Sequence, residues 1–148
     1  MKSNRYDSTK MPWHGWLLGI IFTLFGLGST FDFVLSLIQG EAYYRSSGMT
    51  DSQVAHFMSI PLWAMIAWLF SVIASFFAAV ALLLKHRFSI LLFTLSVIGT
   101  LIYIVYSYAL SEGKAAMGML WPMPFFIIAI TIGMVFYTKK LFSQGILR

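Results

Sequence analysis

The chain has 148 residues and a formal net charge of +5 at pH 7; 59% of its residues are hydrophobic and only 10% are charged. A soluble domain carries about a quarter charged residues, so this composition excludes an ordinary water-soluble globule and favours lipid as the surrounding solvent. The absence of cysteine excludes disulfides, thiolate catalysis and cysteine-ligated metal sites. The basic residues stand at the ends of apolar runs rather than in one patch, so the charge does not indicate nucleic-acid binding.

Four apolar stretches are long enough to cross a membrane as helices, which requires roughly 20 residues each. They cover residues 16–38, 60–84, 88–110 and 117–138. The first contains one acidic residue, Asp32, and the other three contain no charged residue. None shows the alternation that is typical of a membrane β-barrel strand. The sequence therefore predicts an all-α integral membrane protein, with residues 1–148 forming a single four-helix bundle.

The basic leader before the first stretch is similar to the start of a secretory signal peptide. The apolar core of such a peptide is about 7–15 residues long, whereas the apolar residues here continue to Ile38. We therefore expect the first stretch to remain in the protein as a membrane-spanning helix.

The basic residues also predict how the helices are oriented. Eight of the ten lysines and arginines belong to the two tails and to the turn after residue 84: Lys2, Arg5, Lys10, Lys85, Arg87, Lys139, Lys140 and Arg148. The other two, Arg45 and Lys114, belong to the two remaining loops. Because basic residues accumulate on the cytoplasmic side, the sequence predicts an up-down-up-down arrangement with both termini in the cytoplasm.

The loops make further predictions. The turn over residues 85–87 is so short that the helices on either side must be antiparallel neighbours. In the longest loop, Thr50 and Gln53 have the spacing of a helix capping box and precede a short apolar stripe. We expect residues 51–58 to form an amphipathic helical segment at the outer interface.

Two prolines, Pro122 and Pro124, lie early in the fourth stretch. Proline is tolerated in the first turn of a helix, where its missing N–H has no partner to lose. The regular part of this helix is therefore expected to start near Trp121, and a kink at the prolines is the alternative.

Small and polar residues recur at helical spacing in the middle two stretches. The second stretch has a face of small residues, namely Ala67, Ser71, Ser75 and Ala79. The third has a polar stripe, namely Ser96, Thr100, Tyr103, Ser107 and Ser111. Small faces allow membrane helices to approach closely. The stripe indicates either hydrogen bonds between helices, the interpretation we favour, or the lining of a cavity or pathway.

Asp32 carries the clearest functional signal, because an intramembrane acid is a functional-site hypothesis by default. At about 1.5 Å per residue, it lies roughly 9 Å from the outer end of its span. Three arrangements are open: a hydrogen bond to Tyr103 or Ser107 at similar depth, an ion pair with Arg45 or Lys114, or protonation caused by desolvation. Asp32, Tyr103 and Ser107 are therefore the candidate binding residues, although a polar network that closes the outer end would also explain Asp32.

No pattern indicates an enzyme, a metal or a cofactor. A haem held by two histidines needs both at one depth, whereas His14 and His86 are expected at the inner face and His56 at the outer. Several methionines gather near the outer ends of the spans: Met58, Met65, Met117, Met119 and Met123. Thioethers suit Cu(I), but methionine also fills gaps in apolar packing. No nucleotide loop or hydrolytic triad is present, so we expect a non-enzymatic protein without cofactor or metal.

Several segments carry a resemblance to known membrane proteins. These are residues 11–16 (MPWHGW), Phe31-Asp32, Glu41-Ala42-Tyr43, Pro61-Leu62-Trp63 and the basic turn. With them, the chain resembles small four-helix bacterial inner-membrane proteins of unknown activity, which are often labelled sugar transporters. The resemblance implies a bacterial inner membrane. The chain departs from three-span sugar transporters by its fourth span, and from small multidrug transporters by its one-sided charge.

Two functional hypotheses follow. The first is a non-enzymatic accessory or interaction subunit, or a homo-oligomeric bundle, whose partners are membrane lipids and a larger membrane complex or a second copy. The second is a small-solute or proton-coupled transporter in which Asp32, Tyr103 and Ser107 line an outward-facing cavity. A densely packed interior without a cavity near Asp32 would argue against the second hypothesis.

Overall fold

The structure, a computed structural model, describes residues 10–148, so Lys2 and Arg5, which contribute to the predicted orientation, lie outside the described residues. Within the described range the chain is helical and has no strand, as the predicted all-α class requires. Four helical segments there are long and apolar enough to cross a membrane. They are α1 (Trp13–Gln39), α4 (Leu62–Leu83), α5 (Phe88–Val105) continued by the π-helix η1 (Tyr106–Leu110), and α7 (Met123–Ser143).

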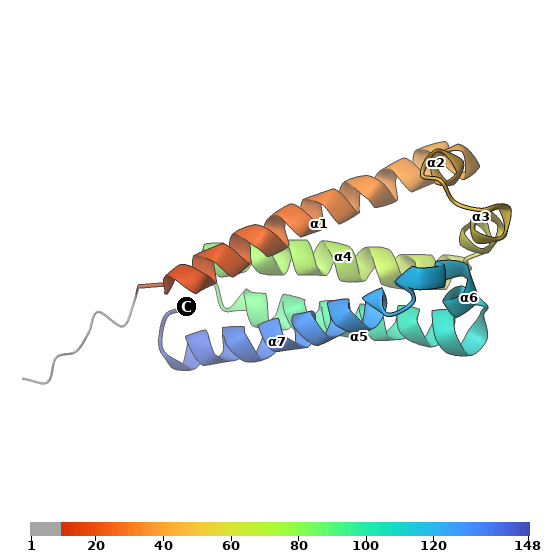
Figure 1. Cartoon of the computed structure of the whole chain (residues 1–148). Coiled ribbons are helices and arrows are strands. Elements are labelled where there is room, and N and C mark those ends of the chain that lie inside the picture. Colours follow the sequence, from red (N-terminus) through yellow and green to blue (C-terminus); the bar gives the residue numbers. More distant parts are fainter. Residues whose placement is uncertain (1–9) are drawn as a thin grey trace, which may run out of the picture.

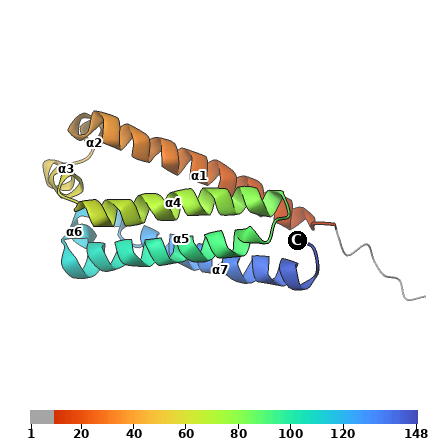
Figure 2. The same ribbon diagram turned by 180° about the vertical axis from the view of Figure 1, so that it is seen from behind.

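The four long helices run in alternating directions and form an open row (Figure 1). Helix α4 packs against α1 on one side and against α5 on the other, and α5 packs in turn against α7 (Figure 2). Helices α1 and α7 are therefore the two edges of the row and do not pack along their length. The end of the molecule that holds the start of α1 and the C-terminus is called the tail end below, and the opposite end is called the loop end.

Helices α4 and α5 approach each other closely at a glycine. A Cβ atom on Gly99 would lie 2.8 Å from the carbonyl oxygen of Ala67 and 2.9 Å from the Cβ of Ser71. Both of these residues belong to the face of small residues predicted on the second span. Because burial alone does not drive association of helices in lipid, such close backbone approach is a main source of contact energy.

The tail end is filled by an apolar cluster. Phe22 of α1 and Phe93 of α5 pack edge to face at its centre, with ring centroids 5.6 Å apart. The last residues of the chain join this cluster through Ile146 and Leu147. Two backbone hydrogen bonds hold the tail in place, from the Arg148 N–H to the Lys85 carbonyl (2.9 Å) and from the Arg87 N–H to the Arg148 carbonyl (2.8 Å).

Short helices cover the loop end: α2 (Glu41–Ser46), α3 (Asp51–Met58), α6 (Gly113–Met117) and the 3₁₀-helix η2 (Gly118–Leu120). Helix α3 covers the segment predicted to be amphipathic, and Thr50 and Gln53 form the expected capping box. The Gln53 side-chain amide also donates to the Ala116 carbonyl at 2.8 Å, which ties α3 to α6.

The fourth long helix differs from the predicted span of residues 117–138. Residues 113–120 form α6 and η2 instead, and α7 begins at Met123 and continues to Ser143. Gly118 ends α6 with a φ of 53°, a conformation that favours glycine. Lysines are good helix formers, so the basic residues after position 138 extend the helix rather than ending it. The first helix likewise begins at Trp13, three residues before the predicted start at residue 16.

Candidate functional site

A groove lies between the two edge helices α1 and α7, with α4 and α5 as its floor. It consists of two adjoining cavities of about 280 Å³ and 420 Å³. The cavities share six lining residues, namely Phe25, Ser29, Ser71, Val72, Thr100 and Ile127. We therefore treat them as the central lobe (280 Å³) and the loop-end lobe (420 Å³) of a single groove.

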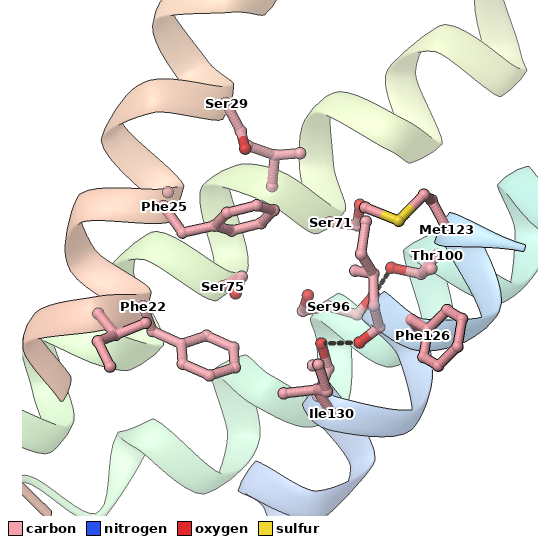
Figure 3. A pocket seen from close by; sticks show the side chains of 15 residues that line it. Phe22, Phe25, Ser29, Ser71, Ser75, Ser96, Thr100, Met123, Phe126 and Ile130 are labelled. Atoms are coloured by element: carbon pink, nitrogen blue, oxygen red, sulfur yellow. Dashed lines mark hydrogen bonds between the residues drawn. The ribbon is translucent and has the colours of Figure 1, made fainter. Parts of the chain in front are cut away.

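The central lobe has apolar walls and a floor of small hydroxyl residues (Figure 3). Phe25 projects from α1, and Phe126 and Ile130 project from α7. On the floor, the Ser71 hydroxyl donates to the Trp68 carbonyl at 2.7 Å. This hydroxyl is satisfied by its own helix, so it adds little polarity to the groove.

The polar stripe of the third span forms part of this floor, and within residues 10–148 its hydroxyls do not form the hydrogen bonds between helices that we favoured. The Thr100 hydroxyl donates to the carbonyl of Ser96, four residues earlier, at 2.9 Å. The Ser111 hydroxyl donates in the same way to the Ser107 carbonyl at 3.3 Å. The hydroxyls of serine and threonine in helices often donate to a carbonyl of the preceding turn. Because these hydroxyls are satisfied within α5, they do not bind a neighbouring helix, and part of the stripe faces a cavity. The Ser96 side chain, only 3% exposed, lines the central lobe.

Asp32 lies on the wall of the loop-end lobe, and its hydrogen-bond partner is Tyr43. The Tyr43 hydroxyl, on α2, donates to Asp32 Oδ1. This hydrogen bond, with a further effect of burial, raises the pKa of Tyr43 above its ordinary value of 10.0. None of the partners expected from the sequence takes this position. The sequence did not indicate Tyr43 as this partner, because the turn that brings α2 back over α1 is not visible in the helical spacing.

The two basic residues that were expected to reach Asp32 have other partners. Arg45 forms ion pairs with Glu41 at 2.7 Å and with Asp51 at 2.6 Å. The hydrogen bond to Glu41 has the largest effect and the one to Asp51 the next largest, and both raise the pKa of Arg45. The Lys114 ammonium lies 4.9 Å from the centre of the Trp121 ring, in a cation–π contact. Within residues 10–148, no basic side chain forms an ion pair with Asp32.

The structure brings Tyr103 to the same lobe as Asp32 but places Ser107 elsewhere. Tyr103 is buried, lines the loop-end lobe and stacks on Trp68, with ring centroids 5.4 Å apart. Ser107 is fully buried and packs against Gly113. The reason is the change from α-helix to π-helix at Tyr106. A π-helix pairs residues five apart, so the face predicted from α-helical spacing does not continue past this point.

The side chains weighed as possible metal ligands lie in several different surroundings. No group of three or more histidine, aspartate or glutamate side chains within the described range could hold a metal ion. Among the methionines, Met119 is 95% exposed, Met123 lines the central lobe, and the sulfur of Met117 accepts a hydrogen bond from Tyr108 at 3.6 Å. Met65 and Met117 both pack against the cluster formed by Ile60, Ala64, Tyr103 and Tyr106.

The groove is closed toward the tail end. His14 Nδ1 and the Tyr137 hydroxyl form a hydrogen bond of 2.5 Å, which joins the start of α1 to the last turns of α7. The cluster around Phe22 and Phe93 fills the space between this contact and the central lobe. A molecule in the groove would therefore lie between the middle of the helices and the loop end.

This groove is suited to binding a ligand, because it combines apolar walls with two stacked aromatic rings and one carboxylate at the loop end. Such a combination of apolar surface with few polar groups is typical of small-molecule sites. Comparison of the chain with known protein families, with curated proteins and with solved structures found no match.

Proposed function

We propose that this chain is a non-enzymatic, multi-pass protein of the bacterial inner membrane that takes a small, mainly apolar molecule into the groove between α1 and α7, as the substrate site of a small-solute transporter. The observation that carries the proposal is the loop-end lobe, a cavity of about 420 Å³ with Asp32 on its wall. An intramembrane acid beside a cavity is the usual mark of a substrate or ion pathway.

The proposed orientation follows from the basic residues. Six of the eight lysines and arginines within residues 10–148 lie at the tail end, namely Lys10, Lys85, Arg87, Lys139, Lys140 and Arg148, and the positive-inside rule assigns that end to the cytoplasm. The tail end then faces the cytoplasm and the loop end faces the periplasm. In this orientation the groove is closed toward the cytoplasm by His14 and Tyr137 and extends toward the periplasm.

The size of the groove favours a small molecule over a protein segment. Ligand sites have volumes of roughly 300–1,000 Å³, and the two lobes, of about 280 and 420 Å³, are of this order.

Water access to the groove tests the proposal. The chain has no cysteine, so single cysteines can be introduced without background. Ser29, which lines both lobes, is replaced by cysteine in one variant. The control is Gly133→Cys on α7, an exposed position where a Cβ would contact nothing within 4 Å. The thiolate is the nucleophile that attacks such thiol reagents, and it forms only where water reaches the side chain.

A membrane-impermeant thiol reagent added on the periplasmic side is expected to label Ser29→Cys much faster than Gly133→Cys, which faces lipid in the proposed arrangement. Equal rates at the two positions would contradict a water-accessible groove. The role of Asp32 is tested separately by Asp32→Asn in proteoliposomes. Transport that is unaffected by this change would show that Asp32 is not part of the mechanism.

A second candidate function is an accessory or interaction subunit, alone or as a homo-oligomer. The observation that favours it is that α1 and α7 are unpaired edges, so each has a face available for a helix of another chain. Extraction in mild detergent tests this candidate. A partner chain or second copy that stays bound would support it, and a strictly monomeric protein without a co-purifying partner would count against it.

A further inference from the structure

We propose that the ligand of this groove is an amphiphilic cation, with an ammonium head beside Asp32 in the loop-end lobe and a single alkyl chain in the central lobe. This inference rests on the proposed binding function of the groove and specifies the class of molecule that it takes.

The charge of the head follows from the surroundings of Asp32. Asp32 is exposed at the surface of the chain, and a carboxylate inside a membrane pairs with a counter-charge or with hydrogen bonds. Asp32 accepts a hydrogen bond from Tyr43, but Arg45 is already paired with Glu41 and Asp51. Within residues 10–148 no cation of the protein neutralises Asp32. A positively charged ligand would supply the missing charge.

The aromatic residues of the loop-end lobe favour an organic cation. Trp68 of α4 and Tyr103 of α5 line the same lobe as Asp32 of α1, and their rings are stacked. Aromatic faces attract ammonium groups, tryptophan most strongly, and this interaction is stronger away from water. A lobe lined by a carboxylate and two aromatic rings is therefore a suitable environment for an alkylammonium head.

The central lobe suits the apolar part of such a molecule. Its walls are formed by side chains such as Phe22, Phe25 and Ile130. The hydroxyls of Ser71, Thr100 and Thr131 on its lining donate to carbonyls of their own helices, so they are satisfied without a ligand. At about 280 Å³ the lobe is small, which favours one chain. The same ammonium chemistry is found in a free alkylamine and in the ethanolamine head of a single-chain lysophospholipid.

Binding of dodecylammonium to the protein in neutral maltoside micelles tests the proposal. Dodecanol, which has the same chain but no charge, is the matched ligand. We expect Asp32→Asn to weaken the binding of dodecylammonium by about tenfold and to leave that of dodecanol unchanged. Retained dodecanol binding also shows that the variant is folded. Asp51→Asn, which removes an acid outside the groove, is expected to change neither ligand.

The outcomes separate this inference from the proposed function. Equal effects of Asp32→Asn on the two ligands would overturn the recognition of a cation while leaving a groove that binds apolar chains. Failure of both ligands to bind the natural protein would overturn the groove as a small-molecule site. Ser29→Phe, which fills the groove without changing its charge, is expected to abolish binding of both.

A competition experiment identifies the source of the ammonium group. Lysophosphatidylethanolamine that displaces dodecylammonium, when lysophosphatidylglycerol of the same chain does not, assigns the site to a lipid head. Lack of displacement by both lipids, with dodecylammonium still dependent on Asp32, assigns it to a free amphiphilic amine.

Discussion

The contact between Asp32 and Tyr43 depends on the residue between their two helices. Gly40 has a φ of 54°, a left-handed value that glycine adopts without strain. Gly40 is the single residue between α1 and α2, so the chain turns back there and Tyr43 comes to lie against Asp32. The position of an acid in the first span could be predicted from the sequence alone. Its partner could not be predicted, because the two side chains are eleven positions apart in the sequence and a non-helical turn lies between them.

The Asp32–Tyr43 hydrogen bond makes a prediction for the titration of Tyr43. A raised pKa means that the folded protein favours the neutral phenol, so the stability from this bond is present below pH 10.0 and is lost as the pH rises through the raised pKa. The difference in ultraviolet absorbance between the natural protein and Tyr43→Phe isolates this phenol. Its midpoint is expected above 10.0, and Asp32→Asn is expected to lower it. A midpoint at or below 10.0 in the natural protein would contradict the contact.

At the scale of elements, the four long helices could be predicted because length and apolarity are local properties of the sequence. The packing of the polar stripe and the position of Ser107 could not be predicted, since back-bonded hydroxyls and the π-helix at Tyr106 change what each face presents. The packing of the C-terminal residues against the bundle could not be predicted either. A short tail that ends in Arg148 has the composition of a solvated end, although Leu147 lies in the apolar cluster.

The contact between α4 and α5 predicts opposite effects for two glycine substitutions. In Gly99→Ala the new methyl group would approach the Ala67 carbonyl to 2.8 Å, and such overpacking destabilises by about 1–3 kcal/mol. In Gly133→Ala the methyl group meets open space, and alanine is favoured over glycine in a helix by up to about 1 kcal/mol. Thermal unfolding in detergent is expected to show a lower Tm for Gly99→Ala only. Similar Tm values for the two variants would contradict this helix interface.

The C-terminal tail makes a second prediction at this scale. Leu147 is 2% exposed, whereas Phe142 on the last turns of α7 is 47% exposed. Truncating a buried leucine destabilises by about 2–5 kcal/mol, so Leu147→Ala is expected to lower the Tm clearly and Phe142→Ala to have little effect. The same unfolding experiment checks both. A Leu147→Ala variant as stable as the natural protein would mean that the tail is not packed against the bundle.

At the scale of the whole molecule, the open row of helices is what creates the groove. Consecutive antiparallel helices explain why α1 packs on α4 and α5 packs on α7, but no connection requires α1 and α7 to meet. They are joined at the tail end by His14 and Tyr137 and are separated by the groove toward the loop end. Because this separation depends on contacts between distant segments, the sequence alone could predict a bundle but not its open side.

The proposed orientation is checked by reporter fusions placed in successive loops. Fusions after Ser47 and after Lys114 are expected to report the periplasm, and a fusion after Arg87 is expected to report the cytoplasm, because the basic residues concentrate at the tail end. The reverse pattern would mean that the groove extends toward the cytoplasm and is closed toward the periplasm.

The most direct test of the central proposal is an experimental structure of the protein extracted with its native lipids and partners. The proposed function predicts separate density for a small molecule between α1 and α7, with its polar end near Asp32 and an extended part beside Phe25 and Ile130. A helix of another chain seated between α1 and α7, or direct packing of α1 on α7 with no space between them, would contradict it.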